Sequence, residues 1–176
     1  MSFHKILVAL DFAAFDTAVF EEAVAIAQAM QARLMLLHCL TPDTLTPPRM
    51  PIPMEVGLRP SLMDSAYEAY QHQTQERMEG DRHLLQSYCD RALQAGIATE
   101  FDQRIGDPGP TICEAARMWD ADLVIVGRRG RSGLAEVLLG SVSNYVVHHA
   151  QRSVLVVQML ESTQETPASQ AAPGTP

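Results

Sequence analysis

The chain has 176 residues, of which 47% are hydrophobic and 19% charged, so it is long enough for one well-buried core and too short for two ordinary domains. Its formal net charge of -8 and pI of about 5.1 argue against broad binding to nucleic acid or to anionic membrane, because both need a positive field. With no apolar stretch of membrane-spanning length, no signal-peptide pattern and three widely separated cysteines, we expect a cytoplasmic protein.

The first part of the chain alternates apolar runs with helical patterns. His4–Leu10 predicts a short buried strand, and Asp16–Met30 repeats apolar residues at helical spacing. Leu34–Leu40 predicts a second strand. Ser61–Ala95 then predicts a long helix that closes at Gly96, a residue type that suits the position after a helix end.

Two segments lack such patterns. Residues 41–60 contain six prolines, which forbid a continuous helix or a central strand and predict a surface insert loop. Residues 159–176 form a tail of small and polar residues that cannot offset its own ordering entropy, so we expect it to be disordered. The folded domain is therefore expected to span residues 1–158.

The second part of the chain continues the alternation. The sequence predicts a strand at Thr99–Ile105, a helix at Pro110–Trp119 that begins with proline, and a strand at Leu123–Val126. A helix at Ser141–His149 and a last strand at Val154–Val157 complete the series.

Strands that are apolar on both faces and joined by helices predict an α/β fold, a doubly wound five-stranded parallel sheet with helices on both faces. We infer the strand order 3-2-1-4-5, which spacing alone does not fix. In such sheets a ligand binds beyond the carboxyl ends of the strands, where the strand order reverses. Asp11, after the first strand, would then face the loop from Gly127 to Ser141 across one crevice.

That loop carries the pattern Gly127-x2-Gly130-x9-Gly140-Ser141, which leads from a strand into a helix. Glycine lets backbone N–H groups approach an anion without an intervening Cβ, and a helix N-terminus presents unpaired donors and the positive end of its dipole. The pattern predicts a phosphate site. The alternative is a turn that needs positive φ and binds nothing, with Gly140-Ser141 as an ordinary N-cap.

The loop also holds Arg128, Arg129 and Arg131 in an otherwise acidic chain. Guanidinium groups suit phosphate oxygens, and the alternative is three solvated loop arginines. The histidines show no metal-ligand spacing, so we expect no zinc site.

The glycine pattern, Asp11 and the closing strand Val154–Val157 resemble the universal stress protein family over about residues 3–158. The resemblance implies the 3-2-1-4-5 sheet. In the subclass that retains these glycines, it also implies binding of ATP or a related adenine nucleotide, such as AMP or cyclic AMP.

Carried over by position, the resemblance implies a role for each site residue. Asp11 would lie near the ribose with Ala9 beside it, Cys39 would offer backbone groups to adenine, and Val126 and Gly127 would border the sugar. The phosphate loop would contain Gly130, Arg131 and Ser132. Donors to the phosphates would come from Gly140, Ser141 and Val142, with the Ser141 hydroxyl also reaching any Mg²⁺ bound through the phosphates.

The sequence excludes a P-loop mechanism and argues against a dinucleotide-binding enzyme. A P-loop needs a lysine in its glycine motif, and the only lysine in the chain is Lys5; a dinucleotide fingerprint is missing after the first strand. We expect a nucleotide-binding stress-response protein with slow or absent hydrolysis. The alternatives are a slow Mg²⁺-dependent ATPase that uses Asp11, a protein-interaction module with an empty crevice, and a flavodoxin-like electron carrier.

The last strand should lie at an edge of the sheet, with unpaired backbone groups and apolar side chains. We therefore expect a twofold homodimer through antiparallel contact of Val154, Leu155, Val156 and Val157, as the resemblance also implies.

Overall fold

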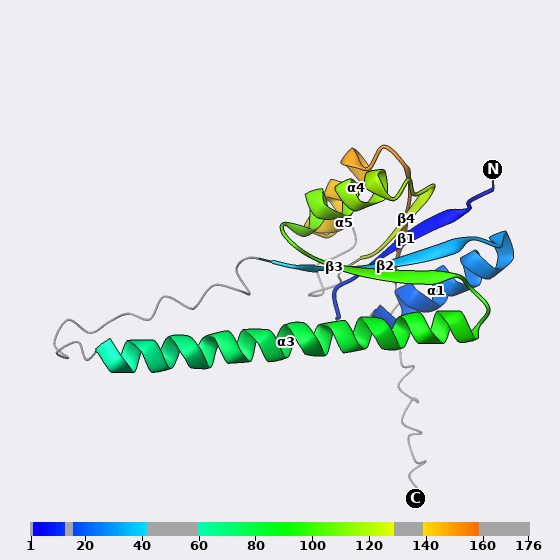
Figure 1. The fold of residues 1–176 in the computed structure, drawn as a ribbon. Coiled ribbons are helices and arrows are strands. Elements are labelled where there is room, and N and C mark those ends of the chain that lie inside the picture. Colours follow the sequence, from blue (N-terminus) through cyan, green and yellow to red (C-terminus); the bar gives the residue numbers. More distant parts are fainter. Residues whose placement is uncertain (1, 13–15, 42–59, 129–138, 159–176) are drawn as a thin grey trace, which may run out of the picture.

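A five-stranded parallel sheet runs through the centre of the molecule (Figure 1). The computed structural model describes residues 2–12, 16–41, 60–128 and 139–158. The strands are β1 (Lys5–Leu10), β2 (Arg33–Leu40), β3 (Thr99–Ile105), β4 (Leu123–Gly127) and β5 (Ser153–Val157). Every strand pair is parallel, and the order is β3-β2-β1-β4-β5. The predicted fold class and strand order are confirmed.

The inner strands are the apolar ones. Ile6, Leu7 and Val8 of β1 are completely buried, and β4 is buried over Leu123–Val126. The expectation that all strands are apolar on both faces is wrong for β3, whose middle residues are only half-buried. There the Arg104 Nε donates to the Asp102 Oδ2 at 2.6 Å. An edge strand tolerates such residues because one of its sides has no neighbouring strand to exclude water.

Helices cover both faces of the sheet (Figure 1). They are α1 (Asp16–Met30), α3 (Pro60–Gln94), α4 (Pro108–Met118) and α5 (Ser141–His149). Buried residues of α1 and α3 form one core with β1 and β2, and those of α4 and α5 form a second core on the opposite face.

Helix ends differ from the prediction by one or two residues. The helix α4 begins at Pro108 rather than Pro110, with Asp107 as its N-cap. Both prolines lie in the first turn, where a missing N–H costs no intrahelical bond. At the far end of α3, Gly96 has a φ of 81°, and the Ile97 N–H donates to the Ala92 carbonyl at 3.0 Å. This confirms the predicted closure at Gly96.

With 35 residues, α3 is about 52 Å long, and its N-terminal half extends past the sheet (Figure 1). Among the described residues, no helix is both long enough and apolar enough to cross a membrane. The predicted insert loop (residues 42–59 of 41–60) and the predicted disordered tail (159–176) lie outside the described residues.

Candidate functional site

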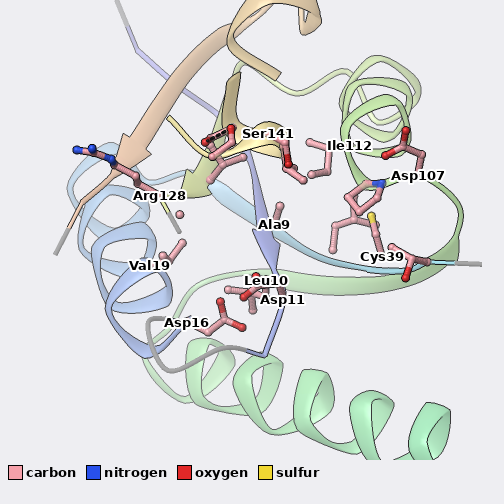
Figure 2. A pocket seen from close by; sticks show the side chains of 18 residues that line it. Ala9, Leu10, Asp11, Asp16, Val19, Cys39, Asp107, Ile112, Arg128 and Ser141 are labelled. Carbon is pink, nitrogen blue, oxygen red and sulfur yellow. Dashed lines mark hydrogen bonds between the residues drawn. The ribbon is translucent and has the colours of Figure 1, made fainter. Parts of the chain in front are cut away.

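A cavity of about 370 Å³ lies at the carboxyl ends of β1, β2 and β4, where the strand order reverses. Its volume falls in the range of small-molecule sites. In Figure 2, Asp11 and Asp16 lie on one side of it and Ser141 on the other, with Ala9 between them. The cavity is the crevice that the strand order predicts.

Most of the predicted binding residues line this one cavity. They are Ala9, Asp11, Cys39, Val126, Gly127, Gly140, Ser141 and Val142. The predicted phosphate-loop residues Gly130, Arg131 and Ser132 lie outside the described residues, as does Arg129. The structure thus brings the two strand ends and the start of α5 together, as expected.

Several lining residues were not predicted: Asp16, Thr41, Asp107, Pro108 and Ile112. Asp107, Pro108 and Ile112 belong to the start of α4, which packs against α5 and β2. Once β2 is known to lie between β3 and β1, the helix that follows β3 must reach this cavity. In the sequence, the Asp107-Pro108 pair marks the start of that helix and could have indicated these residues.

The turn after β1 has an unusual backbone. Phe12 has a φ of 56°, which is uncommon for a residue with a side chain. Its N–H donates to the Asp16 Oδ2, and its ring lies 4.3 Å from that of His38. The buried His38 is held in turn, with Nδ1 2.9 Å from the Leu10 carbonyl oxygen and Nε2 3.5 Å from the Asp81 Oδ2. These contacts fix the backbone that carries Asp11.

Two side chains in the cavity have raised pKa values. Burial, followed by the negative charge of Asp11, raises the pKa of Asp16 from 3.8 to about 7. Burial also raises the pKa of the Cys39 thiol to about 12. Cys39 therefore stays protonated and unreactive at neutral pH, which leaves its backbone and its apolar surface as the groups it offers a ligand.

The cavity glycines do not have positive φ. Among the described residues only Gly96 and Gly106 are glycines of that kind, so the alternative of a positive-φ turn is wrong at Gly127, while Gly130 lies outside the described residues. At Gly140 the predicted N-cap is observed. Gly127 ends β4, and a Cβ placed there would lie 3.0 Å from the Val19 Cγ2. A side chain at this position would therefore have to displace the Val19 methyl group by a few tenths of an ångström.

Gly140 is the N-cap of α5, with φ -59° and ψ 156°. Its carbonyl accepts hydrogen bonds from the Asn144 N–H at 2.8 Å and the Ser143 Oγ at 3.0 Å. The first N–H groups of a helix have no intrahelical partner, and a glycine N-cap has no side chain to satisfy them. The start of α5 therefore directs donors and the positive end of its dipole at the cavity.

Arg128 is the arginine of the predicted cluster that the structure describes, and it lines the cavity. Its N–H donates to the Val157 carbonyl at 2.8 Å, and its Nη1 donates to the Gln158 Oε1 at 2.6 Å. Both contacts lie at the carboxyl end of β5, so they hold the arginine beside the cavity mouth.

Lys5 lies at the opposite edge of the sheet. Its Nζ donates to the Trp119 carbonyl at 2.9 Å and lies 5.4 Å from the centre of the Trp119 ring. The indole N–H donates to the Glu100 Oε1 at 2.7 Å, so Trp119 serves as a packing residue at this edge of the sheet. Within the described part of the chain, no three His, Cys, Asp or Glu side chains are grouped as metal ligands.

The family model and the sequence relatives point to the same family. Residues 2–158 match the model of the universal stress protein family. The chain is 40% identical over 162 residues to the universal stress protein Sll1388 of Synechocystis sp., with 90% of this chain and 99% of that protein covered.

Solved structures share the fold. The hypothetical protein MJ0577 matches with a TM-score of 0.70 at 21% identity, over 92% of this chain and all of that one. A universal stress protein in complex with cAMP matches at 0.53 and 24% identity, over 90% and 98% of the two chains. A family member from Arabidopsis thaliana with AMP bound matches at 0.55 and 20% identity, over 94% and 97%.

Proposed function

The chain belongs to the universal stress protein family, and on that premise we propose that it is a cytoplasmic regulatory protein of the stress response that binds ATP or another adenine nucleotide. The observation that carries the proposal is the cavity, which combines apolar walls, a carboxylate and a helix N-terminus at the strand-order reversal. Two proteins of the same fold bind adenine nucleotides, cAMP in one and AMP in the other.

The cavity offers suitable groups for the adenine, the ribose and the phosphates of a nucleotide. We assign adenine to the apolar side, with Ala9, Cys39 and Ile112 as walls, and the ribose to Asp11, whose carboxylate accepts hydrogen bonds from sugar hydroxyls. We assign the phosphates to the start of α5 at Gly140 and Ser141, where backbone N–H groups and the helix dipole favour an anion. Val126, Gly127 and Val142 line the space between.

We propose that Gly130, Arg131 and Ser132 belong to the phosphate-binding loop, as the family pattern implies. Mg²⁺ would be held through phosphate oxygens and the Ser141 hydroxyl, a set of oxygen donors that suits this ion. When bound, it would neutralise phosphate charge beside a cavity lined by three aspartates.

We propose that hydrolysis is slow or absent. It needs a base or a water-positioning residue near the terminal phosphate, and the segment 128–142 carries Glu136 as its only carboxylate. The second candidate is a slow Mg²⁺-dependent ATPase that uses Asp11, which lies in the same cavity. Single-turnover hydrolysis separates the two, because rapid turnover that Asp11→Ala abolishes would contradict a pure binding function.

Thermal shift tests binding itself. A ligand that binds only the folded state raises the melting temperature, so ATP, AMP or cyclic AMP at millimolar concentration should each be compared with the ligand-free protein. A rise with at least one of them supports the proposal. No shift with any of them would favour a protein-interaction module instead.

We further propose a twofold homodimer through β5. This strand pairs with β4 on one side and lies at the end of the strand order, and Val154, Leu155, Val156 and Val157 are half-buried. Antiparallel pairing with a second copy would satisfy its outer backbone groups. Val156→Lys should then yield monomers in sedimentation velocity, and an unchanged dimer would place the interface elsewhere.

A further inference from the structure

A second carboxyl group, that of Asp16, lies beside Asp11 in the cavity. Asp16 is the first residue of α1 and is only 6% exposed, although most aspartates lie at the surface. The carboxyl group accepts a hydrogen bond from the Phe12 N–H, and it lies beside the carboxyl group of Asp11, whose charge and side chain help to raise the pKa of Asp16. Figure 2 shows the two side chains together on the same side of the cavity.

Two neighbouring carboxyl groups can share a hydrogen bond only when one of them carries a proton. Ionised carboxylates only accept, so one member of the pair must be protonated for the bond to exist. Asp16 is the more buried of the two, whereas Asp11 is exposed to the cavity. The proton therefore belongs mainly to Asp16, and the negative charge belongs mainly to Asp11.

We propose, on the basis of the function proposed above, that Asp16 is a positioning residue for the nucleotide site. Its protonated carboxyl group holds Asp11 in the orientation that receives the sugar hydroxyls, and loss of that proton weakens ribonucleotide binding. The same side chain supports the strained turn at Phe12, because it accepts the N–H of that residue.

Other titratable or charged groups lie on neighbouring elements or line the same cavity. Those on neighbouring elements or on the cavity wall are His38 from β2, Asp81 and Tyr88 from α3, Asp107 before α4 and Arg128 after β4. His38 contacts Asp81, and Arg128 contacts Gln158. The pair is thus governed by its own burial and by the repulsion between its members, which are the two largest causes of the raised pKa of Asp16.

The sign of the pH effect follows from these charges. Below about pH 7 the pair carries one negative charge and keeps its internal hydrogen bond. Above that pH both groups are ionised, so they repel each other and also repel the nucleotide phosphates. Affinity for a ribonucleotide should therefore fall as the pH rises through about 7.

The first experiment compares wild type with Asp16→Asn by calorimetric titration with MgATP between pH 5.5 and 8.5. The amide keeps an acceptor for the Phe12 N–H and a donor for Asp11, but it does not ionise. The ratio of the two Kd values at each pH cancels the titration of ATP itself. We expect similar affinities at pH 5.5 and about tenfold tighter binding by Asp16→Asn at pH 8.5, the usual effect of one charged hydrogen bond.

Asp107→Asn is the matched control, because it removes one carboxylate from the same cavity without touching the pair. Its Kd ratio to wild type should not change across pH 7. A Kd ratio for Asp16→Asn that is equally flat would overturn the proposal while leaving nucleotide binding intact. If wild type binds no nucleotide at any pH, both this proposal and the proposed function fail.

The second experiment tests whether Asp16 acts through the sugar. Asp16→Ala should weaken ATP binding about tenfold and 2′,3′-dideoxy-ATP binding less than twofold, because the dideoxy sugar offers Asp11 no hydroxyl. Equal losses for the two ligands would show a merely structural role and overturn the proposal. If the alanine variant fails to fold, the pH series with Asp16→Asn decides the question.

Discussion

Replacing Asp16 by asparagine should stabilise the folded protein at alkaline pH and leave its stability nearly unchanged in acid. The pKa of Asp16 is about 7 in the folded chain and 3.8 in a chain that exposes it. Between these values the folded state keeps a proton that the unfolded state has lost. Folding stability therefore falls as the pH rises from about 4 to about 7, and the full cost persists above about pH 7.

The size of the effect follows from the two pKa values. A difference of about three pKa units at about 1.4 kcal/mol each sets an upper limit of about 4 kcal/mol. Water entering the cavity around an ionised Asp16 reduces this cost, so we expect roughly half of it, about 2 kcal/mol. For a domain of this length that corresponds to a rise in Tm of about 4–8 °C.

The Tm difference between Asp16→Asn and wild type can be measured by thermal unfolding, followed by circular dichroism, in a buffer series from pH 4.5 to 8.5. Asp90→Asn is the control, because it removes an exposed carboxylate from α3, outside the cavity. The Tm difference between Asp90→Asn and wild type should not rise with pH in the way expected for Asp16→Asn. A constant Tm difference between Asp16→Asn and wild type, or one that shrinks with rising pH, would refute the ionisation argument.

Three further predictions concern phosphate binding at Gly140, the hydrogen-bonded carboxylate of Asp122, and helix packing at Gly109. Gly140→Val should keep the fold, since φ -59° and ψ 156° suit any residue, and lower nucleotide affinity at least about tenfold by calorimetry; retained affinity would contradict phosphate binding at the start of α5. Asp122 accepts two backbone N–H groups at 2.7 and 2.9 Å, which lower its pKa. Asp122→Ala should therefore reduce the urea-unfolding free energy by about 1–3 kcal/mol at pH 7, and the loss should shrink as the carboxyl protonates below pH 3.8. In Gly109→Ala the new Cβ would lie 2.8 Å from the Tyr145 ring, so α4 and α5 must separate at a cost of about 1–3 kcal/mol. Gly80→Ala, in the interior of α3 with open space around its Cβ, should instead raise stability by about 0.5–1 kcal/mol in the same assay.

The elements of this fold could be predicted because their signals are local. Continuous apolar runs identify β1, β2 and β4, and Gly96 marks the end of α3 through a φ that glycine readily adopts. Residues that enter the cavity from α4, such as Ile112, could not be found in this way. Their position depends on which strands are neighbours and on how α4 packs against α5, and neither is written in the spacing of one helix.

Asp16 was missed for a different reason. An aspartate at the start of a helix is ordinarily a solvent-exposed cap, and the sequence around it has no feature that indicates burial. Its carboxyl group accepts the N–H of Phe12, a residue that seldom adopts the positive φ it has here and whose ring contacts His38. A backbone conformation that a residue type disfavours cannot be predicted from that residue type.

The charges around the cavity determine how it can hold a phosphate. Three aspartates line it, Arg128 is the cationic side chain among its described lining residues, and Lys5 is committed to Trp119 at the far edge of the sheet. The described lining residues therefore carry little positive charge. On the proposed function, we expect short-range, directed donors at the start of α5 and a metal counter-ion on the phosphates to supply much of the attraction. Attraction that acts at hydrogen-bond distance would require that nothing larger than a hydrogen atom stand on the backbone at Gly140.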